Sequence, residues 1–236
     1  MIHMELNKIL INSLKCKDTS EEFKKLDNNK TLEQLIPKIN EMKEVGECKY
    51  HVVNCFDHSI NALKEFEDMI KDENFFSNHL KNRIWNYLNT SVEHGISKLD
   101  ILKLGIFLHD IGKPDAKTTD ENGRVHFKGH EKVGGDIVID LGRSLGLSQS
   151  VIDTLFKYVR YHMFLLVFYK KNDISQEKLF EMFDTLEEDT IGAMLLGYAD
   201  IVSTRKLLNP NEEVGVIKTY MEFILTNYEY RYKRLK

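Results

Sequence analysis

The sequence contains little cysteine, proline and glycine, and these shortages exclude several classes of protein. Of its 236 residues, three are cysteine, three are proline and thirteen are glycine. So little proline and glycine excludes a collagen-like, linker-rich or turn-dense all-β chain. The cysteines are Cys16, Cys48 and Cys55. Their odd number, without a Cys-x-x-Cys pair, predicts reduced thiols rather than a disulfide framework.

The sequence also lacks long apolar runs and an excess of basic residues. No stretch approaches the roughly 18 apolar residues of a membrane span, and no basic segment precedes an apolar run at the start, so no signal peptide is expected. The formal net charge is −4, whereas proteins that mainly grip nucleic-acid backbone usually have a strong basic excess. Hydrophobic residues make up 42% of the chain, which is enough for a sizeable core. We therefore expect a soluble cytoplasmic protein with one core and no membrane partner.

Apolar side chains recur with a period near 3.6 residues over most of the sequence, which predicts helices. The predicted helices cover residues 55–70, 97–112, 131–145, 148–162, 175–183, 190–201 and 211–232, with shorter pieces in 20–25 and 31–42. The exception is the polar segment 115–129, where Asn122-Gly123 is typical of a hairpin turn. The expected fold class is all-α, a helical bundle with a small hairpin or ordered loop near 115–129.

The two ends of the chain differ in composition from the middle. Residues 1–45 are rich in Lys, Glu, Asp and Asn and have few apolar anchors. We expect them to form a helical arm or cap on a main domain, residues 46–236, that ends in a helical extension. Residues 228–236 alternate tyrosine with lysine and arginine. This pattern either binds single-stranded nucleic acid or complements the dipole of a last helical turn.

Histidine and aspartate occupy positions on apolar helix faces where packing would favour aliphatic side chains. His109 falls on the same face as Leu102 and Ile106 and is followed by Asp110. Burying an imidazole beside a carboxylate costs several kcal/mol unless something compensates the charge. A divalent cation does so, because imidazole and carboxylate together suit Zn, Mn or Fe. A hydrogen-bonded His–Asp pair within the core is the alternative.

Residues of the same kind occur on other predicted helices. They are His58, His130, His162 and Asp200. Each alone is better explained as a hydrogen-bonded core or cap residue than as a metal ligand. Together with His109 and Asp110 they place such groups on five helices or helix ends. A metal site built from facing helices of a bundle explains all of them with one cause.

The order of these residues resembles that of the HD superfamily of metal-dependent phosphohydrolases. The string His-Asp-Ile-Gly-Lys occupies 109–113, between His58 and Asp200. Residues 108–114 and 122–131 are also similar to the HD region of bacterial tRNA nucleotidyltransferases and poly(A)-polymerase-like proteins. The nucleotidyltransferase head of those enzymes has no counterpart in the sequence, so we do not expect nucleotide addition. The resemblance implies an HD-domain helical bundle that acts as a hydrolase by itself.

The resemblance also implies a set of metal ligands. A first metal would be held by His58, His109, Asp110 and Asp200, and a second by His130 and His162, with Asp110 as the bridge. With one metal, His130 and His162 would instead serve as general acid or phosphate contacts. The expected cofactor is therefore one or two divalent ions, with Fe, Mn, Ni, Zn and Mg not distinguished. A bound metal of this kind lowers the pKa of water to roughly 7.

Other residues are candidates for contact with substrate. Lys113, one turn beyond His109, can place its ammonium over a phosphate or the leaving oxygen. Asp110 and Lys113 are thus the expected catalytic residues, although Lys113 alone would also fit a solvated helix end. We expect His51, His126 and Arg205 at the rim of the pocket as substrate contacts. For Arg205, pairing with a nearby carboxylate is the alternative.

The function expected from these residues is metal-dependent hydrolysis of a phosphomonoester or phosphodiester. The substrate would be a phosphorylated small molecule, a nucleotide or an RNA end. The alternative is an RNA- or protein-binding module with a vestigial HD site, and a di-iron oxygenase is a third reading. The oligomeric state stays open.

Overall fold

Helices account for nearly all of the regular structure in the computed structural model, which describes residues 2–46, 53–93, 95–209, 211 and 214–235. The first half contains α1 (Ile2–Leu14), α2 (Thr19–Asn28), α3 (Thr31–Leu35), α4 (Ile39–Lys43), α5 (Cys55–Lys71), α6 (Asn78–Leu88), α7 (Lys98–Leu108) and α8 (Lys113–Ala116). The second half contains α9 (His130–Ser144), α10 (Gln149–Tyr161), α11 (Phe164–Lys171), α12 (Gln176–Leu186), α13 (Thr190–Leu208), α14 (Gly215–Asn227) and α15 (Lys233–Leu235). The all-α prediction is confirmed.

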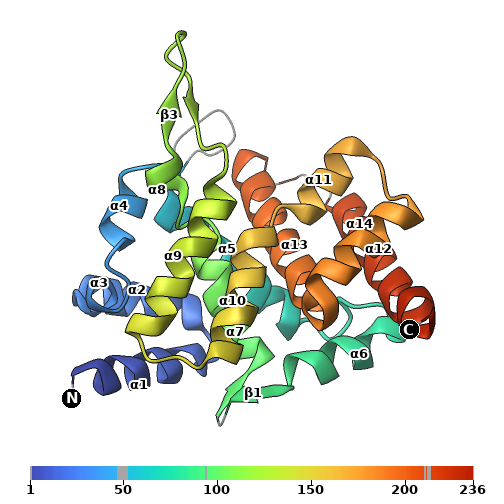
Figure 1. The fold of residues 1–236 in the computed structure, drawn as a ribbon, viewed down its shortest axis with the longest axis horizontal. Helices are drawn as coiled ribbons and strands as arrows, with labels where there is room; N and C mark the ends of the chain where they lie inside the picture. Colours follow the sequence, from blue (N-terminus) through green and yellow to red (C-terminus); the bar gives the residue numbers. More distant parts are fainter. Residues whose placement is uncertain (1, 47–52, 94, 210, 212–213, 236) are drawn as a thin grey trace.

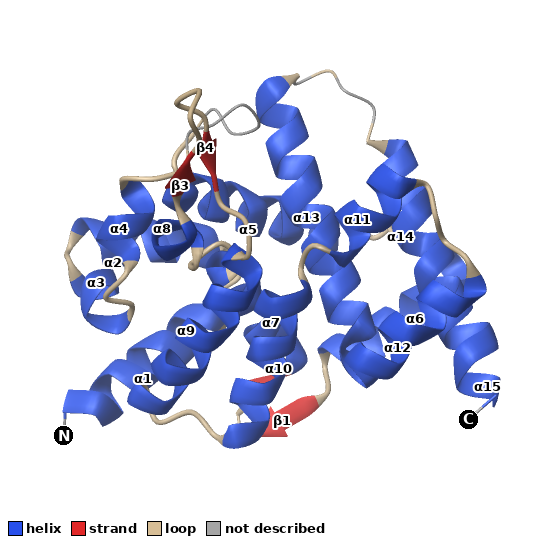
Figure 2. Ribbon diagram, turned by 45° about the horizontal axis from the view of Figure 1, so that its top comes forward, coloured by secondary structure: helices blue, strands red, loops and turns tan. Residues whose placement is uncertain are grey.

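Helix α13 runs through the middle of the bundle (Figures 1 and 2). It packs against α5, α7, α10, α11 and α14. Every residue from Thr190 to Ser203 is buried, because this helix is apolar on all sides and must be covered on every face. Asp200 is the charged residue of that buried stretch. The core of the molecule therefore surrounds a carboxylate.

The helices of the first 45 residues pack on α5 and α7 through apolar side chains and two polar contacts. Leu10, Phe23 and Leu32 are fully buried in the same core as the rest of the chain. The Glu67 carboxylate of α5 accepts hydrogen bonds from the backbone nitrogen (2.9 Å) and hydroxyl (2.5 Å) of Ser20. Lys103 of α7 donates to the carbonyl oxygen of Leu14 at 2.9 Å. The start of α2 and the end of α1 are thus satisfied by side chains of the main bundle.

The polar segment 115–129 forms the predicted hairpin. Strands β3 (Thr118–Thr119) and β4 (Val125–His126) pair antiparallel, and the hairpin projects from the bundle at the top of Figure 1. Gly123 adopts a φ of +74°, which the turn requires and glycine permits. The Asp120 side chain accepts from the backbone nitrogens of Asn122 and Arg124, at 2.9 Å each. The turn is therefore held by its own residues.

Several elements differ from the sequence-based prediction. Helices α1, α6 and α11 were not predicted, nor was the short hairpin of β1 (Ser91–Glu93) and β2 (Ile96–Ser97). The helix predicted from residue 97 ends at Leu108, and the one predicted from residue 211 begins at Gly215 and passes into a π turn at Tyr228–Tyr232. Cys16 and Cys55 are free thiols, and Cys48 lies outside the described residues.

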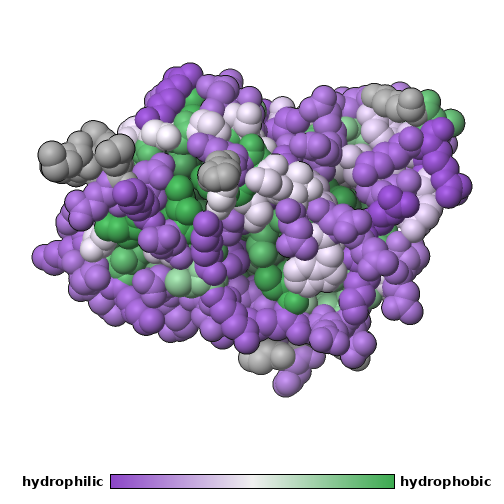
Figure 3. Space-filling view, turned by 90° about the horizontal axis from the view of Figure 1, so that it is seen from below, coloured by the Kyte–Doolittle hydropathy of each residue, from purple (hydrophilic) through white to green (hydrophobic). Residues whose placement is uncertain are grey.

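The surface is predominantly polar on the side that carries α1. Seen from below, hydrophilic side chains cover most of this face, and hydrophobic ones show in separate patches (Figure 3). Among the described helices, none combines the length and the apolar character needed to cross a bilayer.

Candidate metal centre

Six side chains meet where the ends of several helices converge on α13. His58 lies in the first turn of α5, which is capped by Asn54 through a 2.8 Å bond from the Asp57 backbone nitrogen. His109 and Asp110 follow the last residue of α7, His130 is the first residue of α9, His162 follows α10, and Asp200 belongs to α13. We call these six residues the metal centre. Each had been expected there from the sequence.

Two features shape the turn that follows Asp110: the glycine at position 112 and a hydrogen bond from a buried thiol. A Cβ atom on Gly112 would overlap the carbonyl oxygen of His130 and lie 2.5 Å from the backbone nitrogen of Gly134. Only glycine lets the turn pass this close to the start of α9. The Cys55 thiol donates to the carbonyl oxygen of Asp110 at 3.4 Å. These contacts join α5, α7 and α9 around Asp110.

The Asp110 carboxylate lies between two histidine pairs. Its Oδ2 is 3.3 Å from Nε2 of His109 and 3.6 Å from Nε2 of His58. Its Oδ1 is 3.2 Å from Nε2 of His130 and 3.9 Å from Nε2 of His162. Within the described residues, two groups have the spacing of a metal site, and both include Asp110. The arrangement is that of a bridging carboxylate.

Asp200 lies beside the two histidines of the first of these groups. Its Oδ1 lies 3.0 Å from Nε2 of His58 and 3.5 Å from Nε2 of His109. Between the rings, Nε2 of His58 is 3.1 Å from Nε2 of His109, and Nε2 of His130 is 3.2 Å from Nε2 of His162. All six residues are at most 9% exposed. The structure therefore brings the six candidates together in one largely buried cluster.

Hydrogen bonds at the far side of three rings fix which nitrogen faces the centre. Nδ1 of His109 donates to Ile106 (2.7 Å), Nδ1 of His130 to Phe127 (2.8 Å) and Nδ1 of His162 to Val159 (2.8 Å), each to a backbone carbonyl oxygen. Because a carbonyl only accepts, Nδ1 carries the proton and neutral rings direct an Nε2 lone pair inward. Such carbonyl contacts are the usual support of metal-bound histidine. The donor set fits one or two divalent ions.

The electrostatics of the metal centre favour positive charge. Burial opposes protonation of His109, but Asp110 and Asp200 outweigh it and raise its pKa to about 10. Burial, with His109 and His130 adding repulsion, lowers the pKa of His162 to about 3. Burial also opposes charge on Asp110, yet Lys113 and His109 hold its pKa well below the usual range. The two carboxylates thus favour positive charge at the place where a cation would bind.

Lys113 extends the centre on the side of Asp110. It is 4% exposed, so it is not a solvated helix-end lysine. Its Nζ lies 2.5 Å from Oδ2 of Asp110 and 5.8 Å from the centre of the Phe127 ring. Burial opposes its charge, and the Asp110 carboxylate raises the pKa of Lys113 above its ordinary value. Lys113 is therefore a charged ammonium held against the bridging carboxylate.

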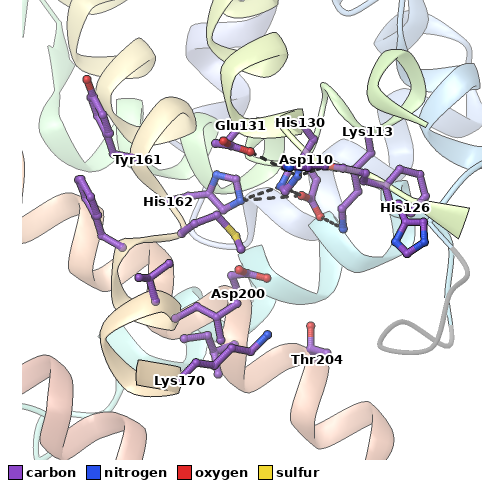
Figure 4. A pocket seen from close by; sticks show the side chains of 18 of the residues that line it. Asp110, Lys113, His126, His130, Glu131, Tyr161, His162, Lys170, Asp200 and Thr204 are labelled. Carbon is purple, nitrogen blue, oxygen red and sulfur yellow. Dashed lines mark hydrogen bonds and ion pairs between the residues drawn. The ribbon is translucent and has the colours of Figure 1, made fainter. Parts of the chain in front are cut away.

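The centre opens on a cleft of about 990 Å³. Asp110, Lys113, His130, His162 and Asp200 line it, and Figure 4 shows Lys170 and Thr204 on the side of Asp200, away from His130 and Asp110. The cleft is thus large enough for a small molecule beside the metal centre.

The expected rim residues have different surroundings. His126 and Arg205 both line the cleft. His126 lies 2.9 Å from Asp120 of the hairpin, and Arg205 lies over the Tyr169 ring at 4.8 Å. His51 lies outside the described residues.

Sequence reasoning missed several residues of the cleft. Glu131, next to His130, lies 3.7 Å from Nδ1 of that ring and 3.8 Å from Arg160. Tyr161 and Phe164 flank His162 and also line the cleft. Their adjacency to ligand-type histidines is the signal that could have identified them.

Comparison with known proteins agrees with this geometry. Two curated proteins, the bifunctional uridylyltransferase/uridylyl-removing enzymes of Mycobacterium tuberculosis strains CDC 1551 / Oshkosh and ATCC 25618 / H37Rv, are each 35% identical to this chain over 86 residues. The match covers 36% of this chain and 9% of each relative. The model of the HD domain family matches residues 56–205, a range that contains all six residues of the metal centre, and the chain therefore belongs to the HD domain family.

Proposed function

We propose that this chain is a metal-dependent phosphohydrolase that acts on a phosphate ester of a nucleotide or of an RNA end. The observation that carries the proposal is the bridging position of Asp110, between two histidine pairs at the base of a cleft. His58, His109, Asp110 and Asp200 would hold one divalent ion, and His130, His162 and Asp110 a second. When bound, such an ion activates water and polarises a phosphate oxygen.

Other groups around the ions would orient the histidine ligands and contact the phosphate. Backbone carbonyls hold the rings of His109, His130 and His162 by Nδ1, so the rings keep their orientation. Lys113 places a buried ammonium at the wall of the cleft, where it can donate to a phosphate or leaving oxygen. Burial keeps bulk water from screening that charge.

Two further considerations support a nucleotide-type ester. The curated relatives are named for removal of a uridylyl group, which is a nucleotide, and the sequence resembles the HD region of tRNA nucleotidyltransferases.

The binding-module alternative gains little from the C-terminal tyrosines. Tyr228 and Tyr232 are 3% and 7% exposed and pack on Phe183, so their rings are already used in the core.

The proposal is tested by hydrolysis assays with and without added Mn, Ni, Fe or Zn. The substrates are p-nitrophenyl phosphate, its diester and a 2′,3′-cyclic nucleotide. We expect metal-dependent turnover that falls at least 1,000-fold in Asp110→Asn, roughly the effect of losing an essential group. Asp136→Asn, an exposed carboxylate of α9, is the matched control and should retain activity. Absence of turnover on all three esters with every metal would refute the proposal.

A further inference from the structure

The cleft beside the metal centre has two chemically different walls. The polar wall includes Asp110, Lys113, His130, His162 and Asp200. The apolar part of the lining, which we call the apolar wall, includes Met163, Phe164, Leu166, Val167, Ile201 and Leu208. A phosphate group alone would need only the polar wall. A cleft of about 990 Å³ with an apolar side indicates a substrate with a sizeable apolar or aromatic part.

The apolar wall is exposed to solvent at its outer edge. Val167 is 37% and Leu208 is 51% exposed, and both line this cleft. Most large apolar side chains elsewhere in the described chain are buried. Covering exposed apolar surface is favourable by about 25 cal/mol per Å². A ligand whose apolar group covered Val167 and Leu208 would gain this favourable free energy of binding.

Two aromatic rings stand at the inner end of this wall. The Tyr161 and Phe164 rings are stacked, with centroids 5.3 Å apart and planes 2° apart. The guanidinium of Arg160 lies over the Tyr161 ring at 5.2 Å. Both rings are partly exposed and line the cleft, and Figure 4 shows Tyr161 on the side away from His126. Arg160, Tyr161 and Phe164 thus form a layered stack, which we call the aromatic stack.

The chain itself fixes the aromatic stack close to the metal centre. Helix α10 ends at Tyr161, α11 begins at Phe164, and His162 lies between them. Two residues of chain span at most about 7 Å. The same connection that directs His162 to the metals therefore sets Phe164 within the length of a small organic phosphate.

The charge of the lining selects an anionic ligand. Basic side chains from five segments line the cleft: Lys113, Lys128, Arg160, Lys170 and Arg205. Its acidic residues are Asp110, Glu131 and Asp200, of which two belong to the metal centre. This distribution favours a phosphorylated aromatic compound over a neutral apolar one.

We propose that the aromatic stack is a nucleobase subsite, so that the substrate is an ester whose phosphate lies at Lys113 and whose base stacks on Phe164. This inference rests on the proposed function and specifies its substrate class as a mononucleotide unit. A nucleobase that stacks on aromatic side chains is bound with little dependence on which base it is. Purine and pyrimidine nucleotides should therefore both be accepted.

The test compares adenosine 5′-monophosphate with ribose 5-phosphate, which has the same phosphate and sugar without the base. The wild-type KM should be about tenfold lower for the nucleotide, as expected for one stacked base. Phe164→Ala should abolish this ratio. Phe164→Leu keeps apolar volume and should abolish most of it, which separates loss of stacking from misfolding. Phe223→Ala is the matched control, because Phe223 is 43% exposed on α14; it should keep the ratio.

A binding measurement separates failure of the subsite from failure of the hydrolase. Isothermal titration of the same two ligands, with decyl phosphate as a third, is carried out on the metal-loaded wild type and Phe164→Leu. Binding of the nucleotide that depends on Phe164 supports the subsite even where turnover is absent. Equal affinity for both sugar phosphates overturns the subsite, whether or not esters are hydrolysed. Tighter binding of decyl phosphate than of the nucleotide also overturns it and would assign the wall to an alkyl chain.

Discussion

Replacing Asp110 with asparagine tests the charge balance of the metal centre in the metal-free protein. The Asp110 carboxylate is 2% exposed and its Oδ2 lies 2.5 Å from Nζ of Lys113, which is 4% exposed. Asparagine keeps the shape of the side chain and removes its charge. The Lys113 ammonium then loses its nearest counter-charge while it stays buried, so we expect a large loss of stability.

The magnitude follows from the cost of breaking a buried ion pair, about 3–5 kcal/mol. For a chain of this length, each kcal/mol shifts Tm by about 2–4 °C, so Asp110→Asn should melt roughly 6–20 °C below the wild type. The assay is thermal unfolding for Tm and urea unfolding for the free energy, both followed by far-UV circular dichroism at pH 7 in excess chelator. Asp136→Asn, on the exposed face of α9, should change stability by less than about 0.5 kcal/mol.

A double variant identifies the cause of the loss. Adding Lys113→Met to Asp110→Asn removes the buried ammonium that has lost the Asp110 carboxylate, so the double variant should be more stable than Asp110→Asn alone. The coupling energy should reach about 1–3 kcal/mol, as for residues in direct contact. Two outcomes would contradict this reasoning: additive effects of the two substitutions on the free energy of unfolding, or an Asp110→Asn protein as stable as the wild type in chelator. Either would show that the ion pair between Asp110 and Lys113 does not stabilise the fold by this amount.

Three further perturbations have definite outcomes. His130→Ala should lower the metal content of protein purified without chelator by about one equivalent, measured by elemental analysis; an unchanged content would refute a second ion. Burial, which outweighs nearby carboxylates, lowers the pKa of Lys103. The unfolded state therefore binds more protons than the folded state. The free energy of unfolding of the wild type, minus that of Lys103→Met, should rise as pH approaches 10.5. A difference that falls over this pH range in urea unfolding would contradict the prediction. Gly112→Ala places a methyl group against the carbonyl oxygen of His130 and should destabilise the fold by at least about 2 kcal/mol, measured by Tm.

The residues of the metal centre could be found from the sequence because each combines two signals. His109, His162 and Asp200 are polar, yet they continue an apolar stripe with helical periodicity. That combination is costly unless the side chains meet a partner, so it points to a shared site. The hairpin was predictable for a similar local reason, since Asn122-Gly123 suits a turn that needs positive φ.

The cleft could not be predicted in the same way. Phe164 and Val167 belong to α11 and have the spacing of ordinary core residues. Whether such a stripe faces the core or a cleft depends on the helices packed beside it, which the sequence does not show. Helix α6 was missed for another reason: its asparagines have low helix propensity. Packing of Leu80 and Ile84 in the core outweighs that preference.

The charges of the metal centre connect its metal content to its affinity for phosphate. Two buried carboxylates, those of Asp110 and Asp200, lie at the centre with the ammonium of Lys113, and they raise the pKa of His109, so the centre favours positive charge. A divalent ion bound there adds positive charge beside the cleft, which attracts an anion. We therefore expect inorganic phosphate to bind at least tenfold more tightly to the Mn-loaded protein than to the chelator-treated protein in isothermal titration. Equal affinities would mean that the basic side chains of the cleft, rather than a metal ion at the centre, hold the phosphate.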